Sequence, residues 1–213
     1  MPFNQYCKEL KGISTHKIDF LESSSIDERE VKELCLTFRS SIEQTGARRE
    51  GILDIFGNIV EKCPLITGAI WSKIPFQVYL AVEECVSEFI DSLSSSGKEG
   101  ILRCHPDLCG RDLTRGTLTE ESQNEQSQAG LTSLNPMERE ILNHLNLQYK
   151  EKFGFTFVIC AKMSDKNKIT QELNSRLQND PCQELQNGID QVKKICHLRI
   201  QDIFFHGKIP TKL

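Results

Sequence analysis

The sequence predicts an all-α fold, a single-domain helical bundle with one short extended segment near residues 153–160. Three observations lead to this prediction. Apolar residues recur at the spacing of one helix face in five stretches, no strand-like runs alternate with those stretches, and one short apolar segment departs from the helical spacing. Helices of this kind bury their apolar faces against one another, as in a bundle.

The first part of the chain differs from the rest. It contains the polar, turn-like run from Glu22 to Asp27, and residues 27–42 could form one helix. We expect residues 1–45 to be an N-terminal extension that is peripheral or partly disordered. Residues 46–213 then form the helical domain, which is long enough to build a core of its own.

The five helical stretches follow one another along this domain. Their apolar faces lie within residues 52–63, 78–93, 141–149, 169–177 and 185–203. Pro64 ends the first stretch, because proline lacks the N–H group that a continuing helix needs. The run from Ser94 to Gly97 ends the second.

A further helix is predicted to begin near Thr117. Residues 117–120 (TLTE) fit a capping box, and acidic residues favour a first helical turn. Beyond them, Ser122, Glu125 and Gln126 share one helix face. A core face would carry apolar groups there, so this polar face either lines a pocket or is solvated.

The extended segment, residues 153–160 (FGFTFVIC), is apolar and rich in β-prone residues, and Gly154 allows the backbone to turn. No neighbouring strand is evident that could pair with its N–H and C=O groups. Those groups need partners all the same. They either pair with a loop or a helix end, or face a bound ligand.

The charge balance excludes two classes of partner. The chain has 26 basic and 30 acidic residues, and no basic stripe interleaved with aromatic residues. The electrostatic footprint of a nucleic-acid binder is therefore missing, and an anionic membrane surface is an equally poor partner. No apolar run approaches the roughly 20 residues of a membrane span. A small anionic substrate remains compatible, because only local charge matters there.

The cysteines and the two termini bear on the cellular compartment. The nine cysteines are irregularly spaced, and residues 1–11 lack the apolar core of a secretory signal. We expect a reducing intracellular compartment, in which most cysteines act as small core residues. The final residues, 211–213 (TKL), resemble the Ser-Lys-Leu peroxisomal address, although Thr replaces Ser. We therefore expect a peroxisomal protein, and otherwise a cytoplasmic one.

His105 is the histidine that stands out among the five. It precedes Pro106, which disfavours helical geometry, and Gly110 lets the chain turn soon afterwards. A histidine in such a loop can present its imidazole to a cleft, where it suits proton transfer near neutral pH. From spacing alone, a structural or helix-capping histidine is the more common outcome.

Two other kinds of chemistry are conceivable around this loop. Cys104, His105 and Cys109 could bind a metal, as in a metal-dependent hydrolase, but paired ligand units such as Cys-x2-Cys are absent. A nucleophilic Cys/His pair is also conceivable. Neighbouring residues rarely aim at each other in that way, and no third group that would orient the histidine is identifiable.

Four segments resemble, in order, motifs of the 2-oxo-4-hydroxy-4-carboxy-5-ureidoimidazoline (OHCU) decarboxylases, particularly the animal enzymes. They are residues 97–108 (GKEGILRCHPDL), 116–126 (GTLTEESQNEQ), 153–160 (FGFTFVIC) and 192–199 (VKKICHLR). The resemblance extends from about residue 52 to the C-terminus. Residues 1–45 lie outside it.

This resemblance implies an all-α homodimer that needs neither a metal nor an organic cofactor. It also implies a carboxy-lyase that converts OHCU to (S)-allantoin in urate degradation, since the substrate's imidazoline ring can accept the electron pair left by carbon dioxide. His105 then corresponds to the catalytic proton shuttle, and Glu125 to an acidic partner that fixes the imidazole or the substrate. The implied substrate contacts are Pro106, Ser122, Gln123, Asn124, Glu125, Gln126, Phe157, Val158, Ile159, Cys160, Ala161 and Arg199.

The chain departs from the family pattern at two positions. Cys109 stands where animal members often carry Ala or Gly, and Lys162 stands where they often carry Arg. Lysine lacks the guanidinium fork, so binding would weaken if position 162 touched the substrate.

The alternative function is a catalytically silent helical interaction module with decayed sites. The presence of His105, Glu125, Gln126 and Arg199 argues against such decay.

Overall fold

The computed structural model describes residues 55–63, 66 and 79–205. Within these residues helices dominate and no strand occurs, so the predicted all-α class is confirmed. The predicted extension, residues 1–45, and the terminal tripeptide lie outside the described residues. None of the described helices is both long enough and apolar enough to cross a membrane.

Seven α-helices and two 3-10 turns follow one another between residues 79 and 205. They are α6 (Tyr79–Ser92), α7 (Ser95–Cys104), α8 (Arg111–Arg115), α9 (Glu120–Gln128), η1 (Leu131–Ser133), α10 (Pro136–Phe153), η2 (Ala161–Met163), α11 (Lys166–Arg176) and α12 (Pro181–Phe205).

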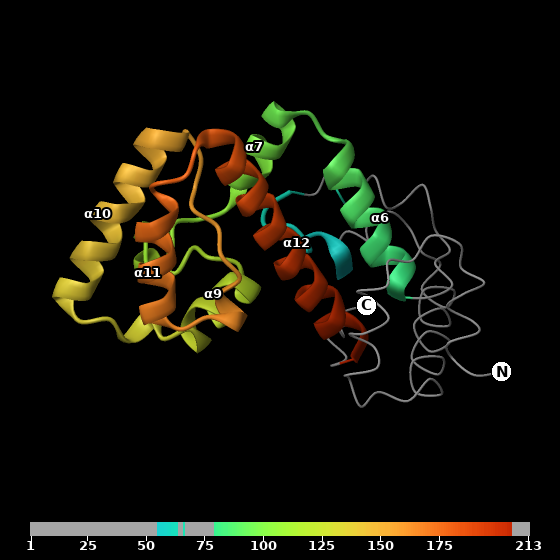
Figure 1. Ribbon diagram of the computed structural model, residues 1–213. Coiled ribbons are helices and arrows are strands. Elements are labelled where there is room, and N and C mark those ends of the chain that lie inside the picture. Colours follow the sequence, from blue (N-terminus) through green and yellow to red (C-terminus); the bar gives the residue numbers. More distant parts are fainter. Residues whose placement is uncertain (1–54, 64–65, 67–78, 206–213) are drawn as a thin grey trace. The chain divides into compact units, whose positions relative to one another are not determined.

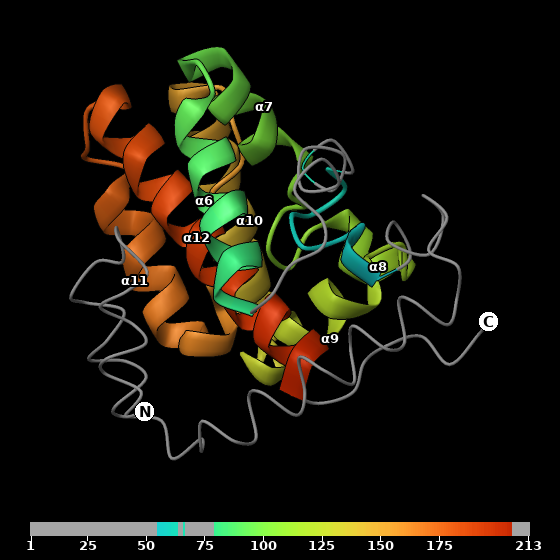
Figure 2. The ribbon, with the colours of Figure 1, turned by 90° about the vertical axis from the view of Figure 1, so that its right-hand side faces the viewer.

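The long helix α12 organises the core, since it packs against both α6 and α7, while α10 packs on α11 (Figure 1). Its fully buried residues include Ile189, Val192 and Ile200, as its periodicity predicts. Gly188 brings α12 close to α7, because an added Cβ would lie 2.8 Å from the Cδ1 atom of Leu102. The two views show α9 beside the C-terminal half of α12 (Figure 2). Both helices contribute residues to the candidate site.

The helix predicted over residues 52–63 is wrong in its described part. Ile55 and Phe56 are helical, but residues 57–62 form turns and bends, and Lys62 has a positive φ of 50°. Gly57 starts this turn, and the side chain of Asn58 accepts the N–H of Lys62 at 3.0 Å. The apolar stripe is nevertheless buried, because Phe56, Ile59 and Val60 all pack inside.

The start of α9 also differs from the prediction. The capping residue is Thr119 rather than Thr117, and its side chain accepts the N–H of Ser122. Thr117 instead donates to Asp112 at 2.8 Å. The reason is local, because Gly116 ends α8 in the left-handed conformation and residues 117 and 118 become the connection to α9.

The predicted extended segment is present, and it begins slightly later than expected. Helix α10 continues to Phe153 and ends at Gly154, which has a φ of 75°. Residues 156–160 belong to neither helix nor strand, and their side chains are buried. The ring of Tyr149 on α10 packs against Phe153, Phe155 and Phe157, which fixes the segment on that helix.

Candidate active site

His105 lies directly after α7, where it forms the C-cap in extended geometry. Pro106 requires that geometry. The loop that follows is anchored to α10, because Asp107 forms an ion pair with Lys150 at 2.7 Å. Gly110 closes the turn on the Asp107 carbonyl, and a Cβ at Gly110 would lie only 2.6 Å from the Cβ of Asp107. The loop therefore holds His105 in one place.

The tautomer of His105 follows from a single hydrogen bond. Its Nδ1 atom lies 2.9 Å from the carbonyl oxygen of Ile101. A carbonyl can only accept, so Nδ1 carries the proton and Nε2 presents a lone pair. Nε2 is buried and has no hydrogen-bond partner among the described residues. Burial lowers the pKa of His105 to about 4, so the imidazole is neutral at physiological pH.

His105 and the polar face of α9 border the same pocket, which encloses about 370 Å³ of space, part of it open to solvent. The lining residues come from the His105 loop, α9, the extended segment with η2, and α12. They are His105, Pro106, Leu108, Ser122, Glu125, Gln126, Phe157, Val158, Ile159, Ala161, Ile195 and Arg199.

Helix α9 supplies the polar wall of this pocket. Ser122, Glu125 and Gln126 are all buried there, so their shared face is a pocket wall rather than a solvated surface. Gln123 and Asn124 are exposed and do not line the pocket, so these two predicted contacts are not brought to it. Their positions on the helix, one and two residues beyond Ser122, point them away from that face.

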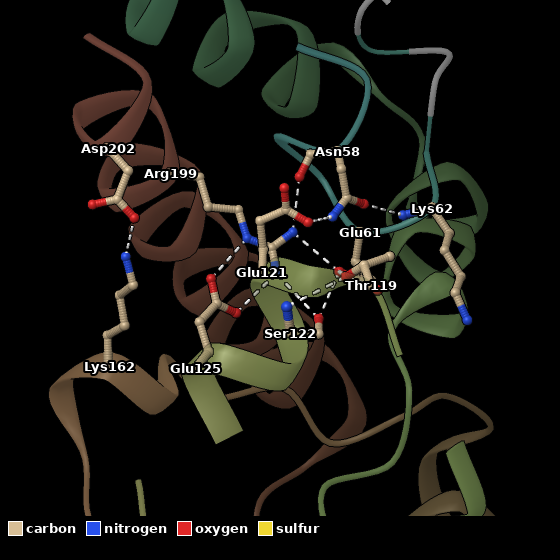
Figure 3. Close-up of polar contacts among 10 residues, drawn as sticks. All are labelled: Asn58, Glu61, Lys62, Thr119, Glu121, Ser122, Glu125, Lys162, Arg199 and Asp202. Atoms are coloured by element: carbon tan, nitrogen blue, oxygen red, sulfur yellow. Dashed lines mark hydrogen bonds and ion pairs between the residues drawn. The ribbon is translucent and has the colours of Figure 1, made fainter. Parts of the chain in front are cut away.

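Arg199 joins α12 to α9 through the hydrogen bonds drawn in Figure 3. Its Nε and Nη2 atoms each donate to one carboxylate oxygen of Glu125 at 2.8 Å. Nη2 also donates to Ser122 at 3.2 Å, and Nη1 donates to the Asn58 carbonyl and to Glu61. A guanidinium group has five N–H bonds, so each of them is paired within the protein.

These contacts show which groups Glu125 and His105 pair with in the structure, while the role expected of Glu125 toward the substrate stays a prediction. Both of its carboxylate oxygens accept from Arg199, and the imidazole of His105 is fixed by the carbonyl of Ile101 instead. The family resemblance implies that Arg199 contacts the substrate. Because all of its donors are engaged, a substrate oxygen could be bound by Arg199 only in exchange for a present partner.

The extended segment forms another wall of the pocket. Several of its backbone groups are paired within the protein. The Val158 carbonyl accepts from Arg176 and the Cys160 N–H donates to Gln191, each at 3.0 Å, and the Cys160 carbonyl accepts the N–H of Met163 at 3.1 Å. Cys160 does not line the pocket. The N–H groups of Phe157, Val158 and Ile159 have no hydrogen-bond acceptor among the residues that the structure describes. All three residues line the pocket.

Known proteins are similar to this chain in sequence and in fold. A model of the OHCU decarboxylase family matches residues 45–201. The chain belongs to this family. It is 68% identical over 164 residues to 2-oxo-4-hydroxy-4-carboxy-5-ureidoimidazoline decarboxylase of Xenopus laevis, covering 77% of this chain and 94% of that protein. The Mus musculus decarboxylase is 57% identical over 151 residues, covering 71% of this chain and 85% of that protein.

Two solved structures are similar in fold. A crystal structure of OHCU decarboxylase in the presence of (S)-allantoin has a TM-score of 0.59 at 20% identity, covering 71% of this chain and 97% of that chain. A crystal structure of (S)-allantoin synthase has a TM-score of 0.57 at 22% identity, covering 81% of this chain and 53% of that chain. At these identities, the likeness supports the OHCU decarboxylase fold alone.

Two residues that matter to the site of this OHCU decarboxylase family member were missed by sequence reasoning. Glu61 and Asn58 both bind Arg199, yet they lie in a stretch interpreted as one apolar helix face. Glu61 is 138 positions from Arg199, so no local spacing could pair them. The one available signal was a carboxylate within an apolar stripe. Leu108 and Ile195 add apolar lining next to residues that were predicted.

The proposed metal ligands of the rival interpretation are not gathered together. Within the described part of the chain, no three His, Cys, Asp or Glu side chains are placed to hold a metal ion. The Cys109 thiol donates to the Leu131 carbonyl at 3.7 Å, and burial raises its pKa. Lys162, the other departure from the family pattern, forms an ion pair with Asp202 and does not line the pocket.

Proposed function

We propose that this protein is a carboxy-lyase that converts OHCU to (S)-allantoin in urate degradation. Membership of the OHCU decarboxylase family supports the substrate and the reaction. The observation that carries the mechanism is the neutral imidazole of His105, with Nδ1 paired to Ile101 and Nε2 left unpaired beside the pocket. Such a group can accept a proton and return it.

Decarboxylation needs a place for the electron pair that carbon dioxide leaves behind. In OHCU the bond to the carboxylate breaks, and its electron pair passes into the imidazoline ring. Nε2 of His105 takes the proton of the adjacent hydroxyl group, which becomes a carbonyl, and delivers it to one face of a ring carbon. One further proton from solvent binds the ring nitrogen that receives the electron pair, so that the loss of carbon dioxide is balanced by the gain of one proton. Delivery from one side accounts for a single enantiomer.

The wall of the pocket contains groups that can donate hydrogen bonds to a ligand. The Oε1 atom of Gln126 accepts the N–H of Cys109 at 3.0 Å, so the amide N–H₂ of Gln126 remains to donate. The unpaired N–H groups of Phe157, Val158 and Ile159 are donors as well. These donors suit the carbonyl oxygens of a ring and a ureido group. Apolar contacts from Ile195 and Leu108 complete the enclosure.

Assembly and localisation extend this proposal. We propose a homodimer, supported by the family resemblance and by the exposed apolar side chains of Met137, Ile141 and Leu147 on α10. Sedimentation at micromolar concentration tests it, and a monomer would contradict it.

We also propose that residues 211–213 direct the protein to peroxisomes. A fluorescent fusion that keeps these residues should be peroxisomal, and its deletion variant cytoplasmic.

The activity is tested by generating OHCU from urate in situ and following optical rotation. We expect the protein to accelerate the appearance of one allantoin enantiomer. A catalytically silent helical module would leave the slow, uncatalysed formation of racemic product unchanged. A well-folded protein without any acceleration would therefore overturn the proposed function.

A further inference from the structure

Glu61 is a fully buried carboxylate outside the helices of the pocket, in the turn formed by residues 57–62. It does not line the pocket itself. Its oxygens accept from the hydroxyl group of Thr119 at 3.0 Å and from Nη1 of Arg199 at 3.0 Å (Figure 3). The shortest contact is from the hydroxyl group of Ser122, at 2.7 Å.

Glu61 is ionised in spite of its burial. Burial by itself would raise the pKa of this carboxyl group. The charge of Arg199 and the hydrogen bonds from Ser122, Arg199 and Thr119 outweigh that effect and hold the pKa below its ordinary value. A carboxylate can only accept hydrogen bonds, so the three contacts have one possible direction.

The direction of the Ser122 contact determines what Ser122 can offer to a ligand. Its only proton points at Glu61, and its oxygen already accepts one hydrogen bond from Arg199 at 3.2 Å. A hydroxyl oxygen has two acceptor positions. One acceptor position of the Ser122 oxygen is therefore unused, and Ser122 lines the pocket. Ser122 can thus accept an N–H from a ligand, and it cannot donate.

We propose that Glu61 is a positioning residue that makes Ser122 an obligatory acceptor for an N–H group of the substrate. It does so by holding the hydroxyl proton of Ser122 away from the pocket, while its contact with Arg199 keeps the guanidinium in register with Ser122. The identity of the N–H, a ureido or ring N–H of OHCU, rests on the proposed function. The acceptor role of Ser122 rests on the geometry alone.

Gln126 can only donate a hydrogen bond to a ligand, whereas Ser122 can only accept one, and this difference affects which ligands the pocket can bind. Gln126 has its oxygen engaged by Cys109 and can only donate through its amide, whereas Ser122 can only accept. Both residues lie on one face of α9 and line one pocket. A ligand with a carbonyl and an N–H side by side satisfies both. A ligand with carbonyls at both places leaves Ser122 facing an acceptor, which costs binding.

A double-mutant cycle tests the proposal with (S)-allantoin, which carries ureido and ring N–H groups, as the probe ligand. Binding is measured by calorimetry for the wild type, Glu61→Gln, Ser122→Ala and the double variant. We expect Glu61→Gln to weaken binding roughly tenfold, the value of one lost hydrogen bond. In the Ser122→Ala background, the same change should weaken binding less than about threefold, because the acceptor is already gone.

Turnover of OHCU gives the second readout. We expect Glu61→Gln to raise KM more than it lowers kcat, because the lost contact is made in the bound ground state. Glu61→Asp, which keeps an acceptor-only carboxylate, should bind (S)-allantoin more tightly than Glu61→Gln. It also serves if the Gln variant fails to fold. The matched control is Glu138→Gln on α10, which removes a half-buried carboxylate that pairs with Lys166 of α11 and should change neither readout.

The possible outcomes separate the two proposals. An inactive wild type that binds (S)-allantoin with the predicted coupling would overturn the proposed function and support the role of Glu61. An active wild type in which Glu61→Gln leaves KM and binding unchanged, or acts equally with and without Ser122, would overturn the role of Glu61. A wild type that neither turns over OHCU nor binds (S)-allantoin would overturn both.

Discussion

The guanidinium of Arg199 and the carboxylate of Glu125 meet through two parallel hydrogen bonds of 2.8 Å each. The two residues are 74 positions apart in the chain, on α12 and α9 respectively. Both are almost fully buried, as is Glu61, which shares the same guanidinium. One cation thus pairs with two carboxylates, of which Glu125 lines the pocket and Glu61 does not, and it joins three separate segments of the chain.

Arg199→Lys is expected to destabilise the protein despite keeping the charge. Lysine is a point donor without the planar fork, so it cannot serve Glu125, Glu61, Ser122 and the Asn58 carbonyl together. Leaving buried charges poorly paired costs about 3 kcal/mol or more. Urea denaturation measures the change in unfolding free energy.

Arg103→Lys is the matched control for this substitution. Arg103 is an exposed arginine on α7 that pairs with Glu99, and such pairs contribute about 0–1 kcal/mol. Equal losses of stability in the two lysine variants would contradict the structural role given to the fork of Arg199.

His105→Ala is expected to remove proton transfer while leaving the fold intact. Positioned proton transfer contributes about 10²–10⁴-fold, so kcat should fall within that range. His144→Ala is the matched control, because His144 is exposed on α10 and does not line the pocket. Steady-state rates with OHCU measure both variants. Wild-type turnover in His105→Ala would contradict the proposed role of His105 in proton transfer.

The pH dependence of kcat/KM should have an unusually acidic lower limb. Burial lowers the pKa of His105 from 6.5 to about 4, and the base form is the one with a free Nε2 lone pair. Activity should therefore hold as pH falls through 6.5 and be lost towards about pH 4. The profile of kcat/KM reports the free enzyme. A midpoint near 6.5 would show that the imidazole is not buried as described.

The same pKa makes a prediction for stability. Between pH 6.5 and about 4, the unfolded chain protonates His105 while the folded protein does not. The unfolded state then binds more protons, so stability falls as pH is lowered through this window. His105→Gln, which does not titrate, should show a smaller fall over the same window. Thermal unfolding at a series of pH values measures it, and parallel curves for the two proteins would contradict the prediction.

Local patterns in the sequence predicted the features that depend on neighbouring residues. The periodicity of residues 169–177 gave the buried pair Ile169 and Leu173, and Pro106 gave the extended geometry at His105. The polar face of α9 was recognisable because Ser122, Glu125 and Gln126 recur at helical spacing. Each of these signals is contained within one element.

Contacts between distant elements were beyond such reasoning. Glu61 reaches Ser122 across 61 positions, and its stretch has the apolar spacing of a helix although Gly57 begins a turn. The same limit explains the role of Glu125, because its partner is on α12 and the residue that fixes His105 is a carbonyl four positions earlier. Backbone carbonyls carry no sequence signature, so Ile101 could not be identified in advance.

Removal of metal ions is expected to leave turnover unchanged. In the proposed mechanism, His105 transfers the proton and the substrate ring receives the electron pair. Cys104, His105 and Cys109 are the residues that a metal-dependent hydrolase would use. Dialysis against a chelator, followed by metal analysis and an activity assay, tests this directly. Loss of activity that stoichiometric zinc restores would favour the metal-dependent alternative.

The extended wall of the pocket should depend on a second buried ion pair. Arg176 pairs with Glu184 at 2.6 Å, donates to the Val158 carbonyl, and lies 4.6 Å above the ring of Phe157. Glu184 also accepts from Tyr149. Arg176→Leu removes all of the arginine contacts and leaves Glu184 buried without its cation. It should therefore destabilise the protein by about 3–5 kcal/mol.

Arg176→Leu should also raise the KM for OHCU, because Phe157 and Val158 lose the support that keeps their N–H groups in place. Tyr149→Phe is the control, since it removes one hydrogen bond to Glu184 and leaves the Val158 contact intact, at a cost of about 1 kcal/mol. Steady-state kinetics on the two variants, at a temperature where both are folded, separate support of the wall from general stability. If Tyr149→Phe raised KM as much as Arg176→Leu, the effect would follow stability rather than the contact with Val158.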